Sequence, residues 1–272
     1  MSGSSGNCFY IGNAMHGVLI DAGVSVRTTR KRLKDIGIDF ENLYGIFITH
    51  DHYDHIKVVS KLGEKHNIPI YSTPTIFEGI NRIPHVRPKL YNNRNNIAIN
   101  EPVRLGEFTV TAFPVSHDGT ENVGYTIEYR GKRFTLATDL GYICENAAQH
   151  IRAANYLVIE SNFDEEMLEN GSYPEFLKRR INSPTGHLSN RQTAEFLSDN
   201  FHAGLKHIFL CHLSLQNNTP QKAYECTAEK LKNKGICVAS SISAPVLGTE
   251  APEVQLTVLN RTMPTGEFYF SD

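Results

Sequence analysis

The chain has 272 residues, a formal net charge of −2, 12 histidines and five cysteines. A chain of this length can bury a sizeable core, and α/β folds of this size often form one domain, so we expect a single domain over residues 1–272. The near-neutral charge excludes a nucleic-acid affinity that depends on bulk charge, but it is compatible with a local basic groove. The sequence contains no C-x-x-C pair, no signal peptide and no apolar stretch of transmembrane length. We therefore expect reduced thiols, no membrane partner and a cytoplasmic protein.

The N-terminal part of the chain predicts a hairpin followed by a basic helix. Residues 8–11 and 18–20 form two short apolar runs around a glycine-containing turn, which is typical of paired strands. Asp21 ends the second run, where an aspartate can serve as a turn or capping residue. Residues 27–36 predict a helix with the sequence R-T-T-R-K-R-L-K-D-I. Its charges either follow a nucleic-acid backbone or form a solvated helix face.

The densest group of metal-ligand residue types follows the next predicted strand. Residues 44–48 form an apolar run typical of a buried strand, and residues 56–67 carry apolar residues at helical spacing. The segment between them, which we expect to be a loop, reads T-H-D-H-Y-D-H. His50 and His52 are two residues apart, so an extended backbone directs both rings to the same side.

Asp54 and His55 follow at the predicted turn, so the segment offers four donors within six residues. Imidazole suits zinc and other divalent metals, and a carboxylate is a further ligand. Four such donors behind a buried strand can begin two adjacent metal sites. The alternative interpretation is a polar turn that carries surface histidines.

These residues resemble a known family. The pattern His50-x-His52-x-Asp54-His55 resembles the signature of the metallo-β-lactamase superfamily. The start of the chain, S-G-S-S-G-N-C-F-Y-I, and the later segment L-I-D-A-G resemble the YycJ-type branch of that superfamily. The resemblance implies an α/β fold, the four-layer αβ/βα sandwich in which two mixed sheets are flanked by helices. It also implies that Asp21 supports a metal-binding histidine through a hydrogen bond.

The Gly/Ser-rich opening of the chain has two interpretations. It is either the remnant of an expression tag or, as the resemblance implies, a native loop. In a native loop the backbone N–H groups and hydroxyls can meet a substrate phosphate. We therefore name Ser4, Ser5 and Asn7 as candidate substrate-binding residues.

The remainder of the chain alternates predicted strands and helices, in agreement with an α/β fold. Residues 82–96 are rich in arginine, lysine and asparagine and predict a loop with a positive rim, formed by Arg82, Arg87, Lys89 and Arg94. In chain order the predicted elements are a strand at 68–72, a helix at 74–81, strands at 107–115, 123–129 and 133–137, a helix at 144–151, a strand at 156–160, helices at 165–169, 174–180 and 191–200, a strand at 206–211, a helix at 221–234, and strands at 237–242 and 254–259.

Three further strand ends resemble metal-ligand positions of the superfamily. The sequence F-P-V-S-H-D places His117 directly after a strand, T-L-A-T-D-L-G does the same for Asp139, and I-F-L-C-H-L-S for His212. The resemblance implies that His50, His52 and His117 hold one metal ion, that Asp54, His55 and His212 hold a second, and that Asp139 bridges them. Two divalent ions are expected, zinc above all, with manganese or iron as alternatives. The alternative interpretation of Asp139 is a helix cap.

Glu160 and His187 resemble a catalytic pair of ribonuclease Z and related phosphodiesterases. Glu160 ends the strand at 156–160, and His187 lies in S-P-T-G-H-L-S-N, where Ser189 or Asn190 can cap the following helix. A histidine exchanges protons near neutral pH, so His187 is placed by the resemblance to protonate a leaving oxygen while Glu160 orients it. The alternative is an ordinary loop histidine.

The resemblance implies a metal-dependent phosphodiester hydrolase in which a hydroxide bridging two ions attacks, with Asp54 also orienting that hydroxide. We predict a nuclease, and the YycJ-type likeness favours a DNA exonuclease, although RNA stays open as a substrate. One alternative is a small-molecule cyclic phosphodiesterase. From another class, a di-iron redox or metal-binding module has the same fold but places a carboxylate where His52 stands. An inactive regulatory binding protein is a third alternative.

Overall fold

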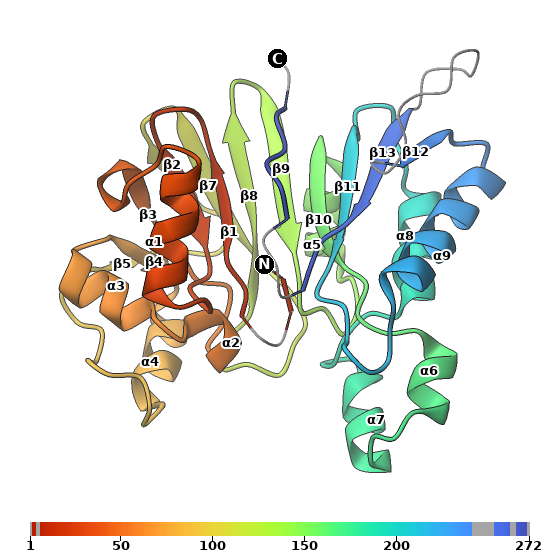
Figure 1. Ribbon diagram of the computed structural model, residues 1–272, viewed down its shortest axis with the longest axis horizontal. Helices are drawn as coiled ribbons and strands as arrows, with labels where there is room; N and C mark the ends of the chain where they lie inside the picture. Colours follow the sequence, from red (N-terminus) through yellow and green to blue (C-terminus); the bar gives the residue numbers. More distant parts are fainter. Residues whose placement is uncertain (1, 4–5, 241–252, 262–264, 271–272) are drawn as a thin grey trace. The chain divides into compact units, whose positions relative to one another are not determined.

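The computed structural model describes residues 2–3, 6–240, 253–261 and 265–270 (Figure 1). The chain forms two compact units. The first unit comprises Met1–Ala112, Asp118–Val123 and Asn260–Asp272, and the second comprises Phe113–His117 and Gly124–Leu259. Among the described residues, no helix is both long and apolar enough to span a bilayer.

A five-stranded mixed sheet, in the order β1-β2-β3-β4-β5, forms the centre of the first unit. β1 and β2 form the predicted antiparallel hairpin, and the other neighbours pair in parallel through helical connections, as parallel strands require. The elements in chain order are β1 Phe9–Gly12, β2 Gly17–Ile20, α1 Val26–Asp35, the 3-10 helix η1 Phe40–Asn42, β3 Leu43–Phe47, α2 Tyr53–Ile56, α3 Val59–His66, β4 Ile70–Ser72, α4 Pro74–Arg82, β5 Arg94–Asn96 and β6 Pro102–Leu105 (Figure 1).

The starts of α1 and α4 follow from local sequence. The side chain of Ser25 accepts a hydrogen bond from the backbone N–H of Thr28, and Thr73 does the same for Ile76. Pro74 occupies the first turn of α4, where its missing N–H has no helical partner to lose. Each cap of this kind stabilises its helix by about 1 kcal/mol.

The prediction of one helix over residues 56–67 is wrong at its start, because the structure has two short helices in this region. α2 already begins at Tyr53, and α3 begins at Val59. The N–H of Val58 donates to the carbonyl of Ala22 at 3.0 Å instead of continuing α2. Asp54 and His55 therefore lie in a helical turn and not in a loop. Periodicity within the segment cannot reveal a break that depends on a hydrogen bond to a distant strand end.

The chain passes from the first unit to the second within β7 Phe108–Pro114, which pairs antiparallel with β6. In the second unit the strands follow the order β12-β13-β11-β10-β9-β8, with β8 and β9 antiparallel and the others parallel. The elements are β8 Val123–Tyr129, β9 Lys132–Ala137, α5 Glu145–Arg152, β10 Tyr156–Glu160, α6 Glu165–Asn170, α7 Glu175–Ile181, α8 Asn190–Asp199, β11 His207–Cys211, α9 Pro220–Asn233, β12 Val238–Ser240 and β13 Val254–Val258 (Figure 1).

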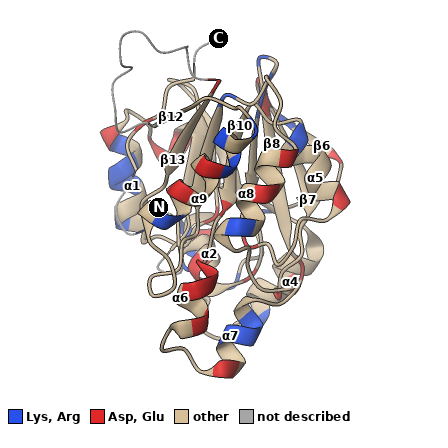
Figure 2. Ribbon diagram, turned by 90° about the vertical axis from the view of Figure 1, so that its right-hand side faces the viewer, with Lys and Arg blue, Asp and Glu red and all other residues tan. Residues whose placement is uncertain are grey.

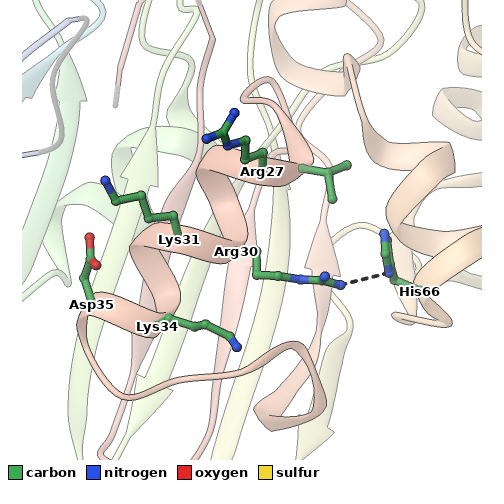
Figure 3. Close-up of a pocket in the computed structure, with 7 residues that line it drawn as sticks. Arg27, Arg30, Lys31, Lys34, Asp35 and His66 are labelled. Carbon is green, nitrogen blue, oxygen red and sulfur yellow. Dashed lines mark hydrogen bonds between the residues drawn. The ribbon is translucent and has the colours of Figure 1, made fainter.

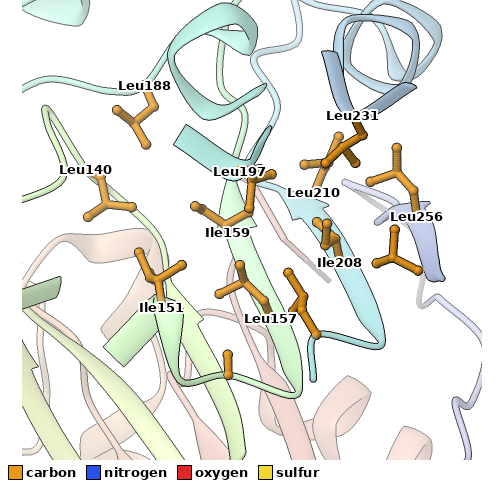
Figure 4. Close-up of a cluster of buried hydrophobic side chains, with 14 of the residues drawn as sticks. Leu140, Ile151, Leu157, Ile159, Leu188, Leu197, Ile208, Leu210, Leu231 and Leu256 are labelled. Carbon is orange, nitrogen blue, oxygen red and sulfur yellow. The ribbon is translucent and has the colours of Figure 1, made fainter. Parts of the chain in front are cut away.

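The core of the second unit lies between its parallel strands and the helices α5, α8 and α9 (Figure 4). Every residue of β10 and β11 is buried, as expected for central parallel strands covered on both faces. A buried Leu or Ile of this kind contributes about 1.5–3 kcal/mol. Figure 4 shows the contributing side chains, among them Leu157 and Ile159 of β10, Ile208 and Leu210 of β11, Ile151 of α5, Leu197 of α8 and Leu231 of α9.

Three further comparisons with the predicted elements concern boundaries. Ser189, and not Asn190, caps α8, and it forms a capping box with Gln192. The predicted loop at 82–96 ends in the short strand β5, and β6 was not predicted, because neither polar segment carries an apolar pattern. The predicted strand at 237–242 corresponds to β12, and residues 241–242 lie outside the described residues.

Candidate metal centre

Three predicted site residues lie at strand ends and have a positive φ, a backbone conformation that is uncommon for residues other than glycine. Asp21 follows β2 with φ 64°, Asp139 follows β9 with φ 60°, and His212 follows β11 with φ 56°. Such left-handed residues cost about 1–3 kcal/mol each and are retained mainly where the surrounding structure imposes them at functional sites. Each turns the chain sharply, so that its side chain leaves the sheet at the carboxyl end of its strand.

In the first unit, the segment after β3 gathers the four donors of the histidine motif. His52 is the residue before α2 and has an extended backbone, while Asp54 and His55 lie in the first turn of α2. The ring centroids of His50 and His52 are 4.6 Å apart, and those of His50 and His55 are 4.1 Å apart. The structure therefore brings together the motif residues that the spacing predicted to converge.

Asp21 and Thr49 orient the histidines of this segment. The Nδ1 atom of His55 donates to Oδ2 of Asp21 at 2.7 Å. The backbone N–H and the hydroxyl of Thr49 donate to the same carboxylate at 2.9 and 3.0 Å, so the hydroxyl oxygen accepts from Nδ1 of His50 at 3.0 Å. With their Nδ1 atoms engaged in this way, His50 and His55 would each use Nε2 to ligate a metal ion.

Burial shapes the electrostatics of this arrangement. Asp21 is fully buried, and burial raises the pKa of its carboxyl, while the hydrogen bonds from His55 and Thr49 act in the opposite direction. A buried carboxylate needs such donors to compensate for lost hydration. The contact expected of Asp21 is present; its role in supporting a metal ligand stays a prediction.

Asn7, one of the predicted substrate-binding residues, contacts two residues of the histidine motif. Its side chain is buried, and its Nδ2 atom lies 3.2 Å from Oδ2 of Asp54 and 2.9 Å from Nε2 of His55. Its backbone N–H donates to the carbonyl of Asp54 at 2.8 Å. These contacts join Asn7 to both Asp54 and His55. Ser4 and Ser5 lie outside the described residues.

A close backbone approach explains the glycine that follows Asp21-Ala22. A Cβ atom on Gly23 would lie 1.5 Å from the carbonyl oxygen of Asp54. The N–H of Gly23 donates to the carbonyl of Asn7. Only glycine allows these segments to lie side by side next to the histidine motif.

Two aspartates near the motif were not singled out from the sequence. Asp51 lies inside the motif, but its carboxylate accepts hydrogen bonds from the N–H and hydroxyl of Thr120, so it fixes a loop. Asp118 has Oδ1 3.4 Å from Nε2 of His52. The sequence does not predict either contact, because both depend on how the loop at residues 118–122 folds against the histidine motif.

In the second unit, four predicted residues converge on one point. Asp139, Glu160, His187 and His212 each offer one ligand atom, and these atoms lie within 4.8 Å of one another. The Nδ1 atoms of His187 and His212 both donate to Oε1 of Glu160 at 2.8 Å. The Nδ1 atom of His212 also lies 3.3 Å from Oδ1 of Asp139.

Glu160 acts as an anchor for both rings. Its carboxylate is fully buried, and Oε2 accepts hydrogen bonds from the N–H groups of Leu140 at 2.8 Å and Leu188 at 3.3 Å. Burial opposes ionisation, but His187 and His212 outweigh it and hold the pKa of Glu160 below its ordinary value. Because all these donors use its lone pairs, Glu160 is better suited to orient the rings than to bind a metal ion.

His117 and His212 are held by backbone and amide groups that the sequence did not indicate. The Nδ1 atom of His117 donates to the carbonyl of Gly186 at 2.9 Å. Asn162 donates through Nδ2 to the carbonyl of His212 at 2.7 Å. A Cβ on Gly186 would lie 2.1 Å from the carbonyl oxygen of Ile181, which explains the glycine before His187.

These residues fit divalent metal ions. Imidazoles whose Nδ1 atoms are fixed by carboxylates, hydroxyls or carbonyls are typical metal ligands, and aspartates complete such sets. The first unit supplies His50, His52, Asp54 and His55, and the second supplies His117, Asp139 and His212. The chemistry of this donor set is compatible with zinc, manganese or iron.

Comparison with known proteins identifies the class of this chain. It belongs to the family described as the beta-lactamase superfamily domain, whose model matches residues 16–212. It is 34% identical over 241 residues to the exodeoxyribonuclease YycJ of Bacillus anthracis, covering 88% of this chain and 90% of that protein. It is 33% identical over 230 residues to the exodeoxyribonuclease WalJ of Streptococcus pneumoniae, covering 85% and 86%.

A solved structure has the same fold as this chain. The Zn²⁺-bound PqqB of Methylobacterium extorquens aligns with a TM-score of 0.65 at 17% identity, covering 92% of this chain and 83% of that chain. The predicted fold class and the YycJ-type likeness are confirmed, and the chain belongs to the metal-dependent hydrolases of this fold. The prediction of a single domain stays a prediction.

Proposed function

We propose that this protein is a metal-dependent phosphodiester hydrolase that degrades DNA as an exonuclease. The observation that carries the proposal is the hydrogen bond from His187 Nδ1 to the buried Glu160, in the same cluster as Asp139 and His212. A histidine of this kind serves hydrolysis of a bond whose leaving oxygen needs a proton. Two relatives that align over most of their length are named exodeoxyribonucleases, which supports DNA as the substrate.

The proposal includes the ligand assignment that the family resemblance implies. One ion is held by His50, His52 and His117, a second by Asp54, His55 and His212, and Asp139 is shared. Support for the individual ligands comes from the hydrogen bonds within each unit, which fix Nδ1 of His55 on Asp21 and Nδ1 of His117 on Gly186. When bound, two such ions supply an activated water at neutral pH and take up negative charge on a phosphoryl oxygen.

His187 is the proposed general acid. Its Nδ1 atom is held by Glu160, so its Nε2 atom is the one that donates a proton to the departing sugar oxygen. The His187 side chain is 17% exposed, whereas Glu160 is fully buried, so solvent reaches the ring and restores the proton after each turnover. Glu160 keeps the ring in one orientation through this hydrogen bond.

Asp54 is proposed both to bind a metal ion and to orient the attacking water. Its Oδ2 atom accepts from the Asn7 amide, which fixes the carboxylate without neutralising its charge. We propose that Asn7 positions Asp54 and His55, in place of the substrate contact predicted from the sequence. We also propose that the whole chain acts as one domain in the cytoplasm, where DNA is available to it.

The test is a panel of end-labelled double-stranded DNA, single-stranded DNA and RNA, incubated with the protein after loading with Zn²⁺, Mn²⁺ or Fe²⁺, together with bis(p-nitrophenyl) phosphate. Progressive shortening of labelled DNA with about two bound metal ions per chain supports the proposal. Hydrolysis of bis(p-nitrophenyl) phosphate without nucleic-acid cleavage would instead indicate a small-molecule phosphodiesterase. Metal binding with oxygen reduction and no hydrolysis would indicate a redox module.

A further inference from the structure

A basic groove lies along the exposed face of α1 in the first unit (Figure 3). Its volume is about 800 Å³. The lining residues are Val26, Arg27, Arg30, Lys31, Lys34 and Asp35 of α1, with His66 at the end of α3. None of them belongs to the metal-ligand set, so the groove is separate from the proposed catalytic residues.

The four cations of the groove occupy one side of the helix. Arg27, Arg30, Lys31 and Lys34 are spaced at i, i+3, i+4 and i+7, which places them along the same helical face. Figure 3 shows Arg27 and Lys31 on one flank and Arg30 and Lys34 on the flank nearer His66. With one carboxylate, Asp35, the lining carries a net charge of +3, whereas the whole chain carries −2. Figure 2 shows the same concentration of Lys and Arg along α1.

Arg30 is held in place without being neutralised. Arg30 donates through Nη2 to Nδ1 of His66 at 3.2 Å, and its guanidinium lies 4.7 Å from the ring centroid of Phe40. Burial and the neighbouring Arg30 and Lys65 lower the pKa of His66, so this partner is neutral at pH 7. Arg30 therefore keeps its full charge in a fixed position.

The remaining cations have few competing carboxylates. Within the described residues, Arg27 and Lys31 have no carboxylate oxygen within 4 Å, and the Lys34–Asp39 pair, at 3.6 Å, is exposed and weak. Asp35, the one carboxylate of the lining, pairs at 3.2 Å with Arg32, which does not line the groove. An anion that enters the groove does not have to displace a strong internal ion pair.

The other basic stretch of the first unit, residues 82–96, differs because three of its cations already have partners within the protein. Arg82 pairs with Glu78 at 3.2 Å, and Lys89 donates to the carbonyl of Ile83 at 2.8 Å. Arg94 lies over the rings of Phe77 and Tyr91. Three cations of the predicted positive rim at residues 82–96 are thus committed to internal contacts, and α1 is the better candidate for binding a polyanion.

Helix stability does not account for the positive charge at the start of α1. The first turn contains no acidic residue and carries Arg27 as its second residue, although the helix macrodipole favours negative charge there. A bound phosphate supplies the negative charge that the first turn lacks. Arg27 is thus locally unfavourable for the isolated helix and favourable for an anion complex.

We propose that this groove binds backbone phosphates of the DNA strand beyond the cleaved bond, which rests on the proposed nuclease function. The segment that leads into α1 is joined to the metal-ligand segment, since Ala22 N–H donates to the His55 carbonyl at 2.6 Å. α1 then extends for ten residues, or about 15 Å. At about 3.4 Å per nucleotide of a B-form strand, the groove spans roughly four nucleotides.

The experiment compares two matched double variants of the metal-loaded protein. R27Q/K31Q removes two groove charges, and R104Q/K232Q removes two exposed charges from β6 and α9 as a control. KM and kcat are measured with DNA oligomers of 4 and 20 nucleotides, and binding of the 20-mer is followed by fluorescence anisotropy over a range of salt concentrations. Thermal melting verifies that both variants fold.

The proposal predicts that R27Q/K31Q raises KM for the 20-mer at least tenfold more than for the 4-mer and has little effect on kcat. The slope of log Kd against log salt falls by about 1.4–1.8, because two phosphate contacts are lost, and the control changes neither quantity. Equal effects of the two double variants, or equal losses on both oligomers, overturn the proposal. A wild-type protein that binds the 20-mer through these residues but cleaves no DNA refutes the proposed nuclease function and not the groove.

Discussion

The Nδ1 atom of His187 lies 2.8 Å from Oε1 of Glu160, and the same oxygen accepts from His212. One buried carboxylate thus orients both the proposed general acid and a proposed metal ligand. Any change at Glu160 is expected to disturb both, whereas a change at His187 is expected to affect proton transfer alone. This difference is the basis for separating the two roles by mutation.

Replacing His187 by Ala is expected to lower the turnover of DNA by about 10²–10⁴-fold, because the departing sugar oxygen loses its proton donor. Bis(p-nitrophenyl) phosphate has a good leaving group, so its hydrolysis is expected to fall much less. Metal content, measured by elemental analysis, is expected to stay as in the wild type. His85→Ala, at an exposed position, is the matched control. Equal losses on both substrates would remove His187 from the role of acid.

Replacing Asp21 by Asn is expected to weaken metal binding by about 10–100-fold. The variant keeps the shape of the side chain, but the neutral amide no longer stabilises the His55 ring through the 2.7 Å contact. Competition with a chromogenic chelator measures the affinity. Asp199→Asn, at the exposed end of α8, controls for the loss of one charge. An unchanged affinity would mean that Asp21 only shapes the turn after β2.

Gly23→Ala is expected to destabilise the protein by about 1–3 kcal/mol and to reduce metal binding, because the new Cβ collides with the Asp54 carbonyl. Gly37→Ala is the control. Its φ is +76° and no atom lies within 4 Å of an added Cβ, so it introduces backbone strain of about 1 kcal/mol without a collision. Urea unfolding and metal titration of both variants give the comparison. Wild-type metal affinity in Gly23→Ala would contradict the close approach.

Acid is expected to destabilise the second unit through His207. Burial lowers the pKa of His207 in β11 to about 4, and its Nε2 atom contacts Thr257 Oγ1 at 2.8 Å. The unfolded chain binds this proton first, near pH 6.5, so stability is fully present above that pH and is lost as the pH falls toward 4. The loss is on the order of 2 kcal/mol.

The His207 prediction is measured as the thermal midpoint of wild type and His207→Gln between pH 7 and pH 5. The variant is expected to lose less stability over this interval than the wild type, since one proton-binding group has been removed. His85→Gln, which changes an exposed histidine, is expected to follow the wild-type curve. Parallel curves for wild type and His207→Gln would show that other groups cause the acid sensitivity.

Much of the secondary structure could be predicted because the signals are local. β10 was predicted with its observed limits, since the apolar run Y-L-V-I-E ends in a charge. The strands at 123–129 and 133–137 were predicted, and Arg130 and Gly131 between them have the positive φ values that a tight hairpin turn needs. Capping by a hydroxyl, as at Ser189, is likewise readable from neighbouring residues.

The sequence by itself determined the kinds of donor in this protein and the strand ends that carry them, because strand periodicity and residue chemistry act over a few positions. Only the tertiary structure decided which atoms of those donors face one another. Thr49 joins Asp21 to His50, Asn7 holds Asp54, and Gly186 holds His117 through contacts between segments that are far apart in the chain. Such pairings depend on how strands order themselves in a sheet, and no local pattern encodes that order.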